Sequence, residues 1–340
     1  MKTASKLVSL DERVGTDISN VASFDDLMDK AGFNFDVEKV PCHTPEGNAL
    51  SGHYVVRRED SKHVLGVMRK RYTPVSNRHM FKPFHDTVQE YGATYETAGL
   101  IEGGKKCWIS ALLPSSFELK NRPDDQIQQR ILALGCHDGT KRNAYFSIAH
   151  RISCNNQLRL ILQGASNSTY SVSHTKNWEA QWLDAQVGFD EAIRAHNTFE
   201  STANTLNEKD ITVAQVRGFT NLLLPDREIS EEVQKLRAVR GRKASTRIPS
   251  RREEIVNLFI SGAGNRGASR WDALNAVTEY LDHHNQAKKL EGKDGFRNAQ
   301  RRFMSNVFGG LGDQTKQRAL GLLLNTKEFD TVLEPQYINN

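Results

Sequence analysis

The sequence has few cysteines, no long apolar run and no strong excess of charge of either sign. Its 4 cysteines form no CxxC pair and no spacing typical of a disulfide framework, so we expect reduced thiols and a cytoplasmic location. No apolar stretch approaches the roughly 18 residues that a membrane-spanning helix needs, and the N-terminal residues have no apolar core of signal-peptide length. We therefore expect no membrane partner. A net charge of +5 over 340 residues permits a nucleic-acid partner without requiring one.

The motifs of two large enzyme classes are also missing or misplaced. No G-x-x-x-x-G-K-[ST] occurs, which excludes a P-loop enzyme. Residues 262–267, GAGNRG, match G-x-G-x-x-G, but a dinucleotide site needs a buried strand directly before the glycines. Residues 252–260 instead have the apolar spacing of an amphipathic helix, so we interpret the match as a flexible helix–helix linker. We expect no cofactor.

The most site-like stretch lies between residues 131 and 163. An apolar run at 131–134 meets a polar turn, HDGT, at 137–140, and the side chains of residues 144–149 then alternate between two faces. This pattern predicts a strand, a turn and a second strand. A polar cluster, R-x-x-C-N-N, follows from Arg151 to Asn156. Polar groups are therefore expected at both ends of one predicted hairpin.

Changes in periodicity divide the chain into an N-terminal arm (1–45), an α+β core (46–175) and a helical region (176–335). The predicted core elements are strands at 53–57 and 64–68, a helix with Pro83 at its first position, and a hairpin of 94–101 with 106–113 around Gly103-Gly104. We expect a mostly antiparallel sheet with a helix on one face, followed by an α-helical C-terminal region. In that region, the first predicted helix has an apolar stripe from 178 to 199, and the second covers 211–224 and is capped by Asp210. The next two have Ser250 and Glu253 in a capping box and a start at Ser269. The last predicted helical segments are 296–308 and 314–324.

Three basic clusters favour nucleic-acid binding. Residues 235–252 contain eight Lys or Arg and no acid, in a loop-like composition suited to phosphate contacts. A second cluster follows a predicted strand at 69–72, and a third includes Arg297 and Arg301. The alternative is that these are solvated surface charges. The expected contact residues are Arg69, Lys70, Arg71, Tyr72, Tyr145, Arg151, Arg240, Arg242 and Lys243, with the tyrosines stacking on bases.

Two other classes of function stay open. His137, Asp138 and Cys154 lie close in sequence, and a hairpin could bring them together as the centre of a zinc- or thiol-dependent enzyme. The simpler interpretation is that Asp138-Gly139 is a turn in which the carboxylate binds backbone amides, and that the cysteines are partly buried. A protein–protein interaction factor that acts on a host protein is the remaining alternative. It predicts a stable complex and no affinity for nucleic acid.

Three motifs together resemble a phage/plasmid-like family of unknown function, domain-of-unknown-function family 932, which is carried on prophages and mobile elements. They are the HDG turn, the R-x-x-C-N-N run and WDALNAVTEYLDHH at 271–284, and the match covers residues from about 25 to 325. The motif residues are His137, Asp138, Gly139, Cys154, Asn155, Asn156, Trp271, Asp272 and Asn275. The resemblance implies a mobile-element protein and no catalytic residue. From the three basic clusters, together with a layout analogous to that of phage annealing proteins, we expect a non-enzymatic protein that binds single-stranded DNA, assists annealing or recombination and forms homo-oligomers.

Overall fold

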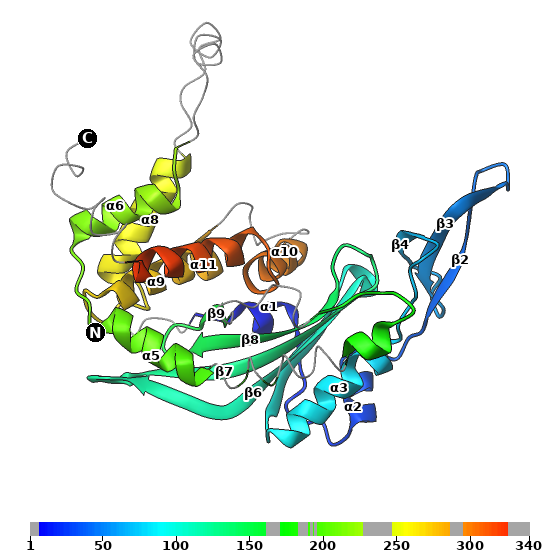
Figure 1. Cartoon of the computed structure of the whole chain (residues 1–340), viewed down its shortest axis with the longest axis horizontal. Coiled ribbons are helices and arrows are strands. Elements are labelled where there is room, and N and C mark those ends of the chain that lie inside the picture. Colours follow the sequence, from blue (N-terminus) through cyan, green and yellow to red (C-terminus); the bar gives the residue numbers. More distant parts are fainter. Residues whose placement is uncertain are drawn as a thin grey trace, which may run out of the picture.

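The computed structural model describes residues 7–160, 171–182, 190, 193, 196–226, 247–285 and 295–325 (Figure 1). Its centre is an antiparallel sheet with the strand order β1-β5-β6-β7-β8-β10, in which β9 also pairs with β8. The strands are β1 (Thr16–Asp17), β5 (Thr94–Ile101), β6 (Lys106–Leu119), β7 (Arg122–Cys136), β8 (Asn143–Arg151), β9 (Asn156–Leu160) and β10 (Ser171–Val172). The predicted strand–turn–strand at 131–149 is thus confirmed. The Gly103-Gly104 hairpin is confirmed too, with φ angles of 71° and 105° at the two glycines.

Alternation along the strands separates two apolar faces of this sheet. Ile131 and Tyr145 pack with α2 (Phe24–Lys30) and α3 (Asn77–Glu90), which lie on one face. Leu132 and Ile148 point the other way and join a cluster with α1 (Leu10–Val14) and α10 (Gly295–Val307). Because successive side chains of a strand point to opposite faces, one sequence run supplies both clusters. The predicted antiparallel α+β architecture, with a helix on one face and helices at the C-terminal end, is confirmed.

The helix on the first face begins earlier than expected. Ser76 accepts a hydrogen bond from the backbone N–H of His79 and caps α3, so that Pro83 lies inside the helix and not at its start. A serine N-cap satisfies one of the unpaired amides of the first turn, and this local hydrogen bond sets the boundary. The preference of proline for a first helical position was therefore the weaker indicator.

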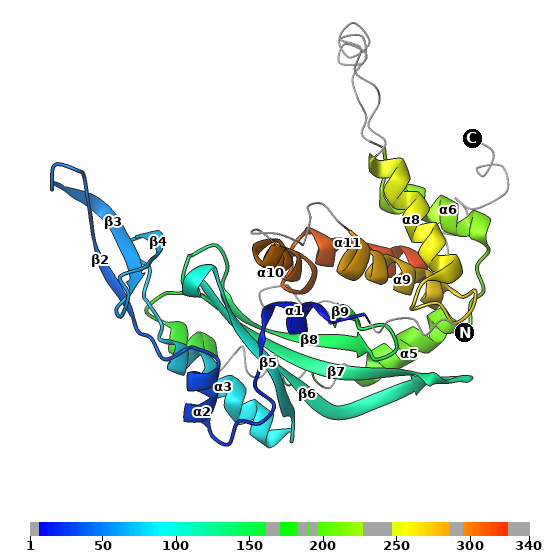
Figure 2. The ribbon, with the colours of Figure 1, turned by 180° about the vertical axis from the view of Figure 1, so that it is seen from behind.

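The two strands expected at the start of the core do not belong to the main sheet. They form β3 (Ala49–Arg58) and β4 (Val64–Arg69), which pair with β2 (Val37–His43) in a separate sheet of the order β2-β3-β4. Val56, Leu65 and Met68 make its small apolar core. We call these three strands the β-arm, because Figures 1 and 2 show them projecting from one end of the main sheet. The prediction of one sheet for residues 46–175 was wrong, because β3 pairs with its neighbours in the chain, β2 and β4, and none of the three pairs with a strand of the main sheet.

The C-terminal helices pack against one another and against the sheet, over β8 and β9 and around the end opposite to the β-arm (Figures 1 and 2). They are α5 (His196–Asn207), α6 (Val213–Leu223), α8 (Arg247–Ser261), α9 (Arg270–Glu279), the π-helical turn η2 (Tyr280–His284) and α11 (Leu311–Leu324), besides α10. The capping box predicted at Ser269 and Asp272 is confirmed. Thr212, not Asp210, caps α6, and α8 already begins at Arg247, which leaves Ser250 inside the helix. The middle of the stripe predicted at 178–199 lies outside the described residues.

The described part of the segment predicted as an N-terminal arm, residues 1–45, packs into the folded structure and does not stand apart from it. In this part, Leu10 and Val14 are buried, and β1 adds an edge strand to β5. Asp11, also buried, receives hydrogen bonds from Arg130 and Thr97. The apolar and charged contacts of this segment are made with residues far along the chain, which explains why its own sequence reads as irregular.

Candidate functional site

The HDG turn between β7 and β8 is held by buried polar contacts. The His137 ring is inaccessible to solvent and its Nε2–H donates to Asn77 Oδ1 at 2.8 Å. Burial lowers the pKa of His137 to about 3, so that the ring is neutral. Burial raises the pKa of Asp138, but hydrogen bonds from Lys106 and Thr140 outweigh it and hold that pKa below its usual value. The backbone N–H of Thr140 donates to Asp138 at 3.0 Å, which confirms the turn interpretation.

The R-x-x-C-N-N residues lie at the opposite end of β8. The guanidinium of Arg151 forms a two-point ion pair with Asp125, and the two side chains are 3% and 1% exposed. Arg151 also donates to the carbonyl of Gly264. Asn155, at a φ of 54°, accepts a hydrogen bond from His150 Nε2 at 3.0 Å. These side chains therefore make their ion pairs and hydrogen bonds inside the protein.

The third motif, on α9, meets the second across Asp125. Trp271 Nε1–H donates to Asp125 Oδ2 at 3.3 Å, and Asp272 receives two hydrogen bonds of 2.9 Å from Arg122. A cavity of about 20 Å³ lies among the R-x-x-C-N-N and α9 side chains, large enough for one water molecule. Sequence reasoning missed Asp125 and Arg122. The charged run from Arg122 to Asp125 gives no hint that two of its members are turned inward.

The side-chain amide N–H groups of Asn156 and Asn275 are paired in the same interior. Asn275 Nδ2–H donates to the carbonyl of Trp271 at 2.8 Å, and Asn156 Nδ2–H donates to the carbonyl of Asn275 at 3.3 Å. Because each buried polar group has to replace the water it loses, such pairs determine how β9 docks on α9. The R-x-x-C-N-N and α9 motifs therefore build a polar scaffold that joins the sheet to the C-terminal helices, whereas the HDG turn lies at the other end of β8.

The GAGNRG segment connects α8 to α9, which confirms a helix–helix linker. The backbone N–H groups of Ala263 and Gly264 donate to the carboxylate of Glu279 at 2.9 and 2.7 Å. In a dinucleotide site, amides of such a glycine-rich turn would receive the pyrophosphate. Here an internal carboxylate occupies them, and a helix precedes the glycines.

The geometry also separates the three residues considered for an enzyme centre. His137 and Asp138 precede β8, whereas Cys154 follows it, and the nine residues of β8 span about 30 Å. Burial raises the pKa of the Cys154 thiol, which keeps it protonated and a weak nucleophile. No group of three or more metal-binding side chains occurs within the described residues. The idea that the hairpin unites these residues in one centre was wrong, because they stand at opposite ends of its second strand.

The predicted cationic segment at the end of β4 is exposed. Arg69, Lys70 and Arg71 lie at the surface, and within the described residues none of them pairs with an acid. Lys39 Nζ donates to the carbonyls of Lys70 and Tyr72 at 2.8 and 2.7 Å and holds the segment in place. The ring of Tyr72 stacks on His174, with centroids 4.6 Å apart, so that this face is occupied within the protein.

Other predicted contact residues are not at this surface. Tyr145 is 2% exposed and stacks on Trp182, and Arg151 is 2% exposed, so neither can touch a nucleic acid in this structure. Arg240, Arg242 and Lys243 lie outside the described residues. The helices that flank them, α6 and α8, stand at the end of the sheet opposite to the β-arm in Figures 1 and 2.

Two cations that the sequence analysis did not single out lie beside the β4 segment. Lys141 and the exposed Arg142 follow the HDG turn, and the Tyr72 hydroxyl donates to the carbonyl of His137 at 3.5 Å. A Cβ on Gly66 would lie 3.2 Å from Asp138 Cα, which shows how closely β4 approaches the turn. We call Arg69, Lys70, Arg71, Lys141 and Arg142 the basic edge. It belongs to two chain segments that only the folded structure brings together.

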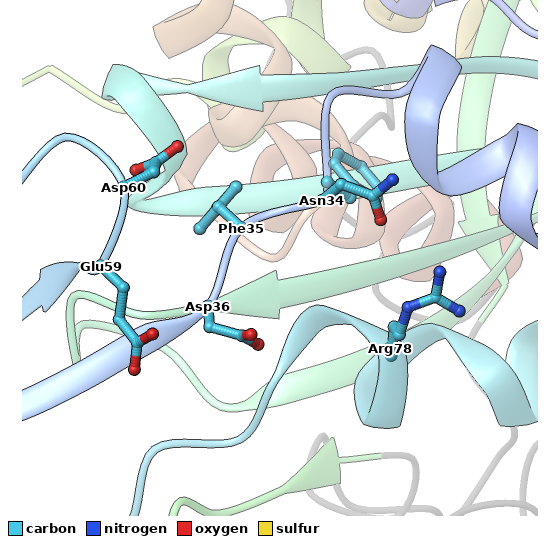
Figure 3. Close-up of a pocket in the computed structure, with 7 residues that line it drawn as sticks. Asn34, Phe35, Asp36, Glu59, Asp60 and Arg78 are labelled. Atoms are coloured by element: carbon cyan, nitrogen blue, oxygen red, sulfur yellow. The ribbon is translucent and has the colours of Figure 1, made fainter.

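A hollow at the base of the β-arm carries negative charge, opposite to that of the basic edge. This pocket of about 480 Å³ is lined by Asp36, Glu59, Asp60 and Arg78, among others. Figure 3 shows the Asp36 carboxylate between Glu59 and Arg78, with Asp60 on the neighbouring turn. Arg58 neutralises Asp60 and holds the pKa of that carboxyl well below its usual range. Asp36 and Glu59 still give this hollow a negative lining, which is unfavourable for a polyanion.

Fold and site define an antiparallel α+β protein with a buried polar scaffold at one end of β8 and an exposed cationic edge at the other. The chain belongs to the family described as Domain of unknown function (DUF932), whose model matches residues 64–305. The match begins at β4, so that β2 and β3 precede it. No curated protein and no solved structure matches the chain. Among the described residues, none of the helices combines the length and the apolar character needed to cross a bilayer.

Proposed function

We propose that this protein is a non-enzymatic, single-stranded DNA-binding accessory protein of a phage or mobile element, and that it assists annealing or recombination. The basic edge is the observation that supports the proposal. Its cations are exposed or half-exposed and carry no acidic partner within the described residues. Each phosphate that they neutralise releases a condensed counterion, which favours binding at low salt.

The surroundings of the basic edge favour an unpaired strand over a duplex. Phe146, on the β8 side of the edge, is a half-buried ring near Lys141 and Arg142, and unpaired bases can stack on such a ring whereas paired bases cannot. A sheet with a helix across one face is also the layout of several phage annealing proteins, which is an analogy of fold alone.

A salt series on single-stranded oligonucleotides tests the proposal. Replacing Arg69, Lys70 and Arg71 together by glutamine removes three phosphate contacts. The slope of log K against log salt should then fall by about 2, and affinity at 0.1 M salt should fall about 100-fold. The matched control replaces three other cations by glutamine, at Lys30, Lys120 and Arg217. These side chains are exposed, lie away from the basic edge, and their removal changes net charge equally.

Three outcomes would contradict the proposal. They are a wild-type protein whose binding does not depend on salt, a Kd weaker than about 10⁻⁴ M, and an equal loss of affinity in the control variant. The third outcome would mean that net charge alone, and not the basic edge, determines binding.

A protein–protein interaction factor is the second candidate, and the β-arm supports it. Val64 and Val67 of its edge strand β4 are 49% and 59% exposed. Exposed apolar side chains on an edge strand favour pairing with another chain, including a second copy in a homo-oligomer. Light scattering with and without single-stranded DNA separates the candidates. Val67→Lys should lower the mass of any assembly that forms through this strand.

A further inference from the structure

Another pocket, distinct from the acidic hollow at the base of the β-arm, adjoins the basic edge, and none of the sequence motifs points to it. Its volume is about 320 Å³, at the lower end of the range of about 300–1,000 Å³ for small-molecule sites. Its lining includes Lys141, Arg142, Phe146, Arg159, Ser171 and Phe308. β9 pairs with β8 from Ser147 onward and β10 pairs with Asn143 and Ala144, so that Phe146 lies between these two partner strands.

One half of this pocket is aromatic and rigidly supported. The rings of Phe146 and Phe308 meet edge to face, with centroids 5.2 Å apart. Phe308 is 1% exposed and packs in turn against Phe303 at 5.0 Å. Phe146 itself remains half-exposed. A ring that is held from behind and stays partly accessible is a preorganised stacking surface, because little conformational freedom is lost when a flat ligand covers it.

The other half of the pocket is cationic. Arg159 lies over the Phe146 ring at 5.8 Å, but its charge is balanced by Asp313, which accepts a hydrogen bond from Arg159 Nε at 2.6 Å. Lys141 Nζ donates to the carbonyl of Phe308 at 3.0 Å, which places its ammonium at the pocket, and Arg142 is exposed beside it. Neither Lys141 nor Arg142 has an ion-pair partner within the described part of the chain. Two positive charges are therefore left for an anionic ligand.

We propose that this pocket binds one nucleotide of a single strand, with its base against Phe146 and its phosphate between Lys141 and Arg142. The inference rests on the proposed function and gives it a nucleotide subsite. A base needs an accessible aromatic ring and a phosphate needs unbalanced cations, and the pocket offers both, with Phe146 partly exposed beside Lys141 and Arg142. Because stacking does not depend on base identity, the subsite tolerates any sequence.

Ligand-observed NMR with deoxyadenosine 5′-monophosphate tests the subsite directly. Deoxyadenosine and inorganic phosphate serve as partial ligands, and each should bind more weakly than the nucleotide. Phe146→Leu and Arg142→Gln should each weaken nucleotide binding about tenfold. Phe296→Leu is the matched control, since Phe296 is 59% exposed and does not line the pocket. Arg142 is at the surface, so its variant keeps the test decisive even if Phe146→Leu folds poorly.

A crossed comparison distinguishes failure of the subsite from failure of the proposed function. Arg71→Gln should weaken binding of a long oligonucleotide and leave the mononucleotide unaffected, because Arg71 lies outside the pocket. If single-stranded DNA binds but inorganic phosphate matches the nucleotide, or if Phe146→Leu and Arg142→Gln change nothing, the subsite is refuted and DNA binding stands. If the nucleotide binds through Phe146 and long DNA does not, the DNA-binding function is refuted and the subsite stands.

Discussion

Replacing Arg151 by methionine tests whether the R-x-x-C-N-N motif is a scaffold or a nucleic-acid contact. The substitution keeps much of the side-chain volume but leaves the Asp125 carboxylate, 1% exposed, without its counter-charge. Asp125 would keep one hydrogen bond, from Trp271 at 3.3 Å, and the carbonyl of Gly264 would lose its donor. Removing one partner of a buried ion pair costs about 3–5 kcal/mol of unfolding free energy. For a protein stabilised by about 5–15 kcal/mol, this is a large fraction.

Urea unfolding, followed by tryptophan fluorescence, measures the loss. The control is Arg217→Met, which breaks an ion pair with Glu253 in which both side chains are about half exposed, and it should cost about 0–1 kcal/mol. Adding Asp125→Asn to Arg151→Met should recover about 1–3 kcal/mol, since the buried charge is then removed while an oxygen remains for Trp271. The recovery distinguishes an unpaired charge from a simple loss of packing.

The nucleic-acid side of the test uses conditions under which the Arg151→Met variant is folded. The salt slope for single-stranded DNA should equal that of the wild-type protein, because Arg151 is buried. If Arg151 contacted a phosphate, the slope would fall by about 0.7. A loss of stability below about 1 kcal/mol together with a lower salt slope would refute the scaffold interpretation.

Two further predictions concern ionisable groups. Burial raises the pKa of Glu96 to about 7, although Arg130 lies 2.8 Å away and is shared with Asp11. The folded protein therefore holds this proton more tightly than the unfolded chain, and the ionised carboxyl destabilises the fold increasingly as pH rises from about 4.5 to 7. Glu96→Gln should unfold like the wild-type protein at pH 5 and be more stable at pH 8 by up to about 3 kcal/mol; equal stability at both pH values would contradict this. In native protein, a maleimide should modify the partly exposed Cys42 before Cys154, because burial raises the pKa of the Cys154 thiol. Mass spectrometry of the labelled peptides measures the order, and earlier labelling of Cys154 would contradict the prediction.

The parts of the fold that the sequence predicted well are those set by neighbouring residues. The β7–β8 pair follows from alternation at 131–149, the β5–β6 hairpin from Gly103-Gly104, and the start of α9 from Ser269 and Asp272. The helix start at Pro83 was misplaced because the Ser76 cap sets the boundary of α3, and Ser250 lies inside α8, which includes Arg247. The separate β-arm could not be anticipated, since period-two strands look alike whichever sheet they join.

The candidate site was predicted only in part. The exposed segment at 69–71 was found from its charge, and its exposure agrees with that prediction. Tyr145 and Arg151 were taken for contact residues because residue type does not reveal burial, which depends on Trp182 and Asp125. Lys141 and Arg142 were missed because two basic residues after a turn are unremarkable until β4 and Phe308 lie beside them.

The sequence by itself determined the β7–β8 and β5–β6 strand pairs, the tight turns between them, the cap at Ser269 and the family, because each depends on side-chain pattern and backbone preference over a few neighbouring positions. Only the tertiary structure decided which charges are paired inside the protein and which stay exposed at its surface. Arg151 is neutralised by Asp125, whereas Arg142 forms no ion pair with an acid in the described part of the chain, and both are arginines in short polar segments. The difference comes from contacts between elements distant in the chain, since burial and counter-charge are properties of the folded surroundings and not of the residue.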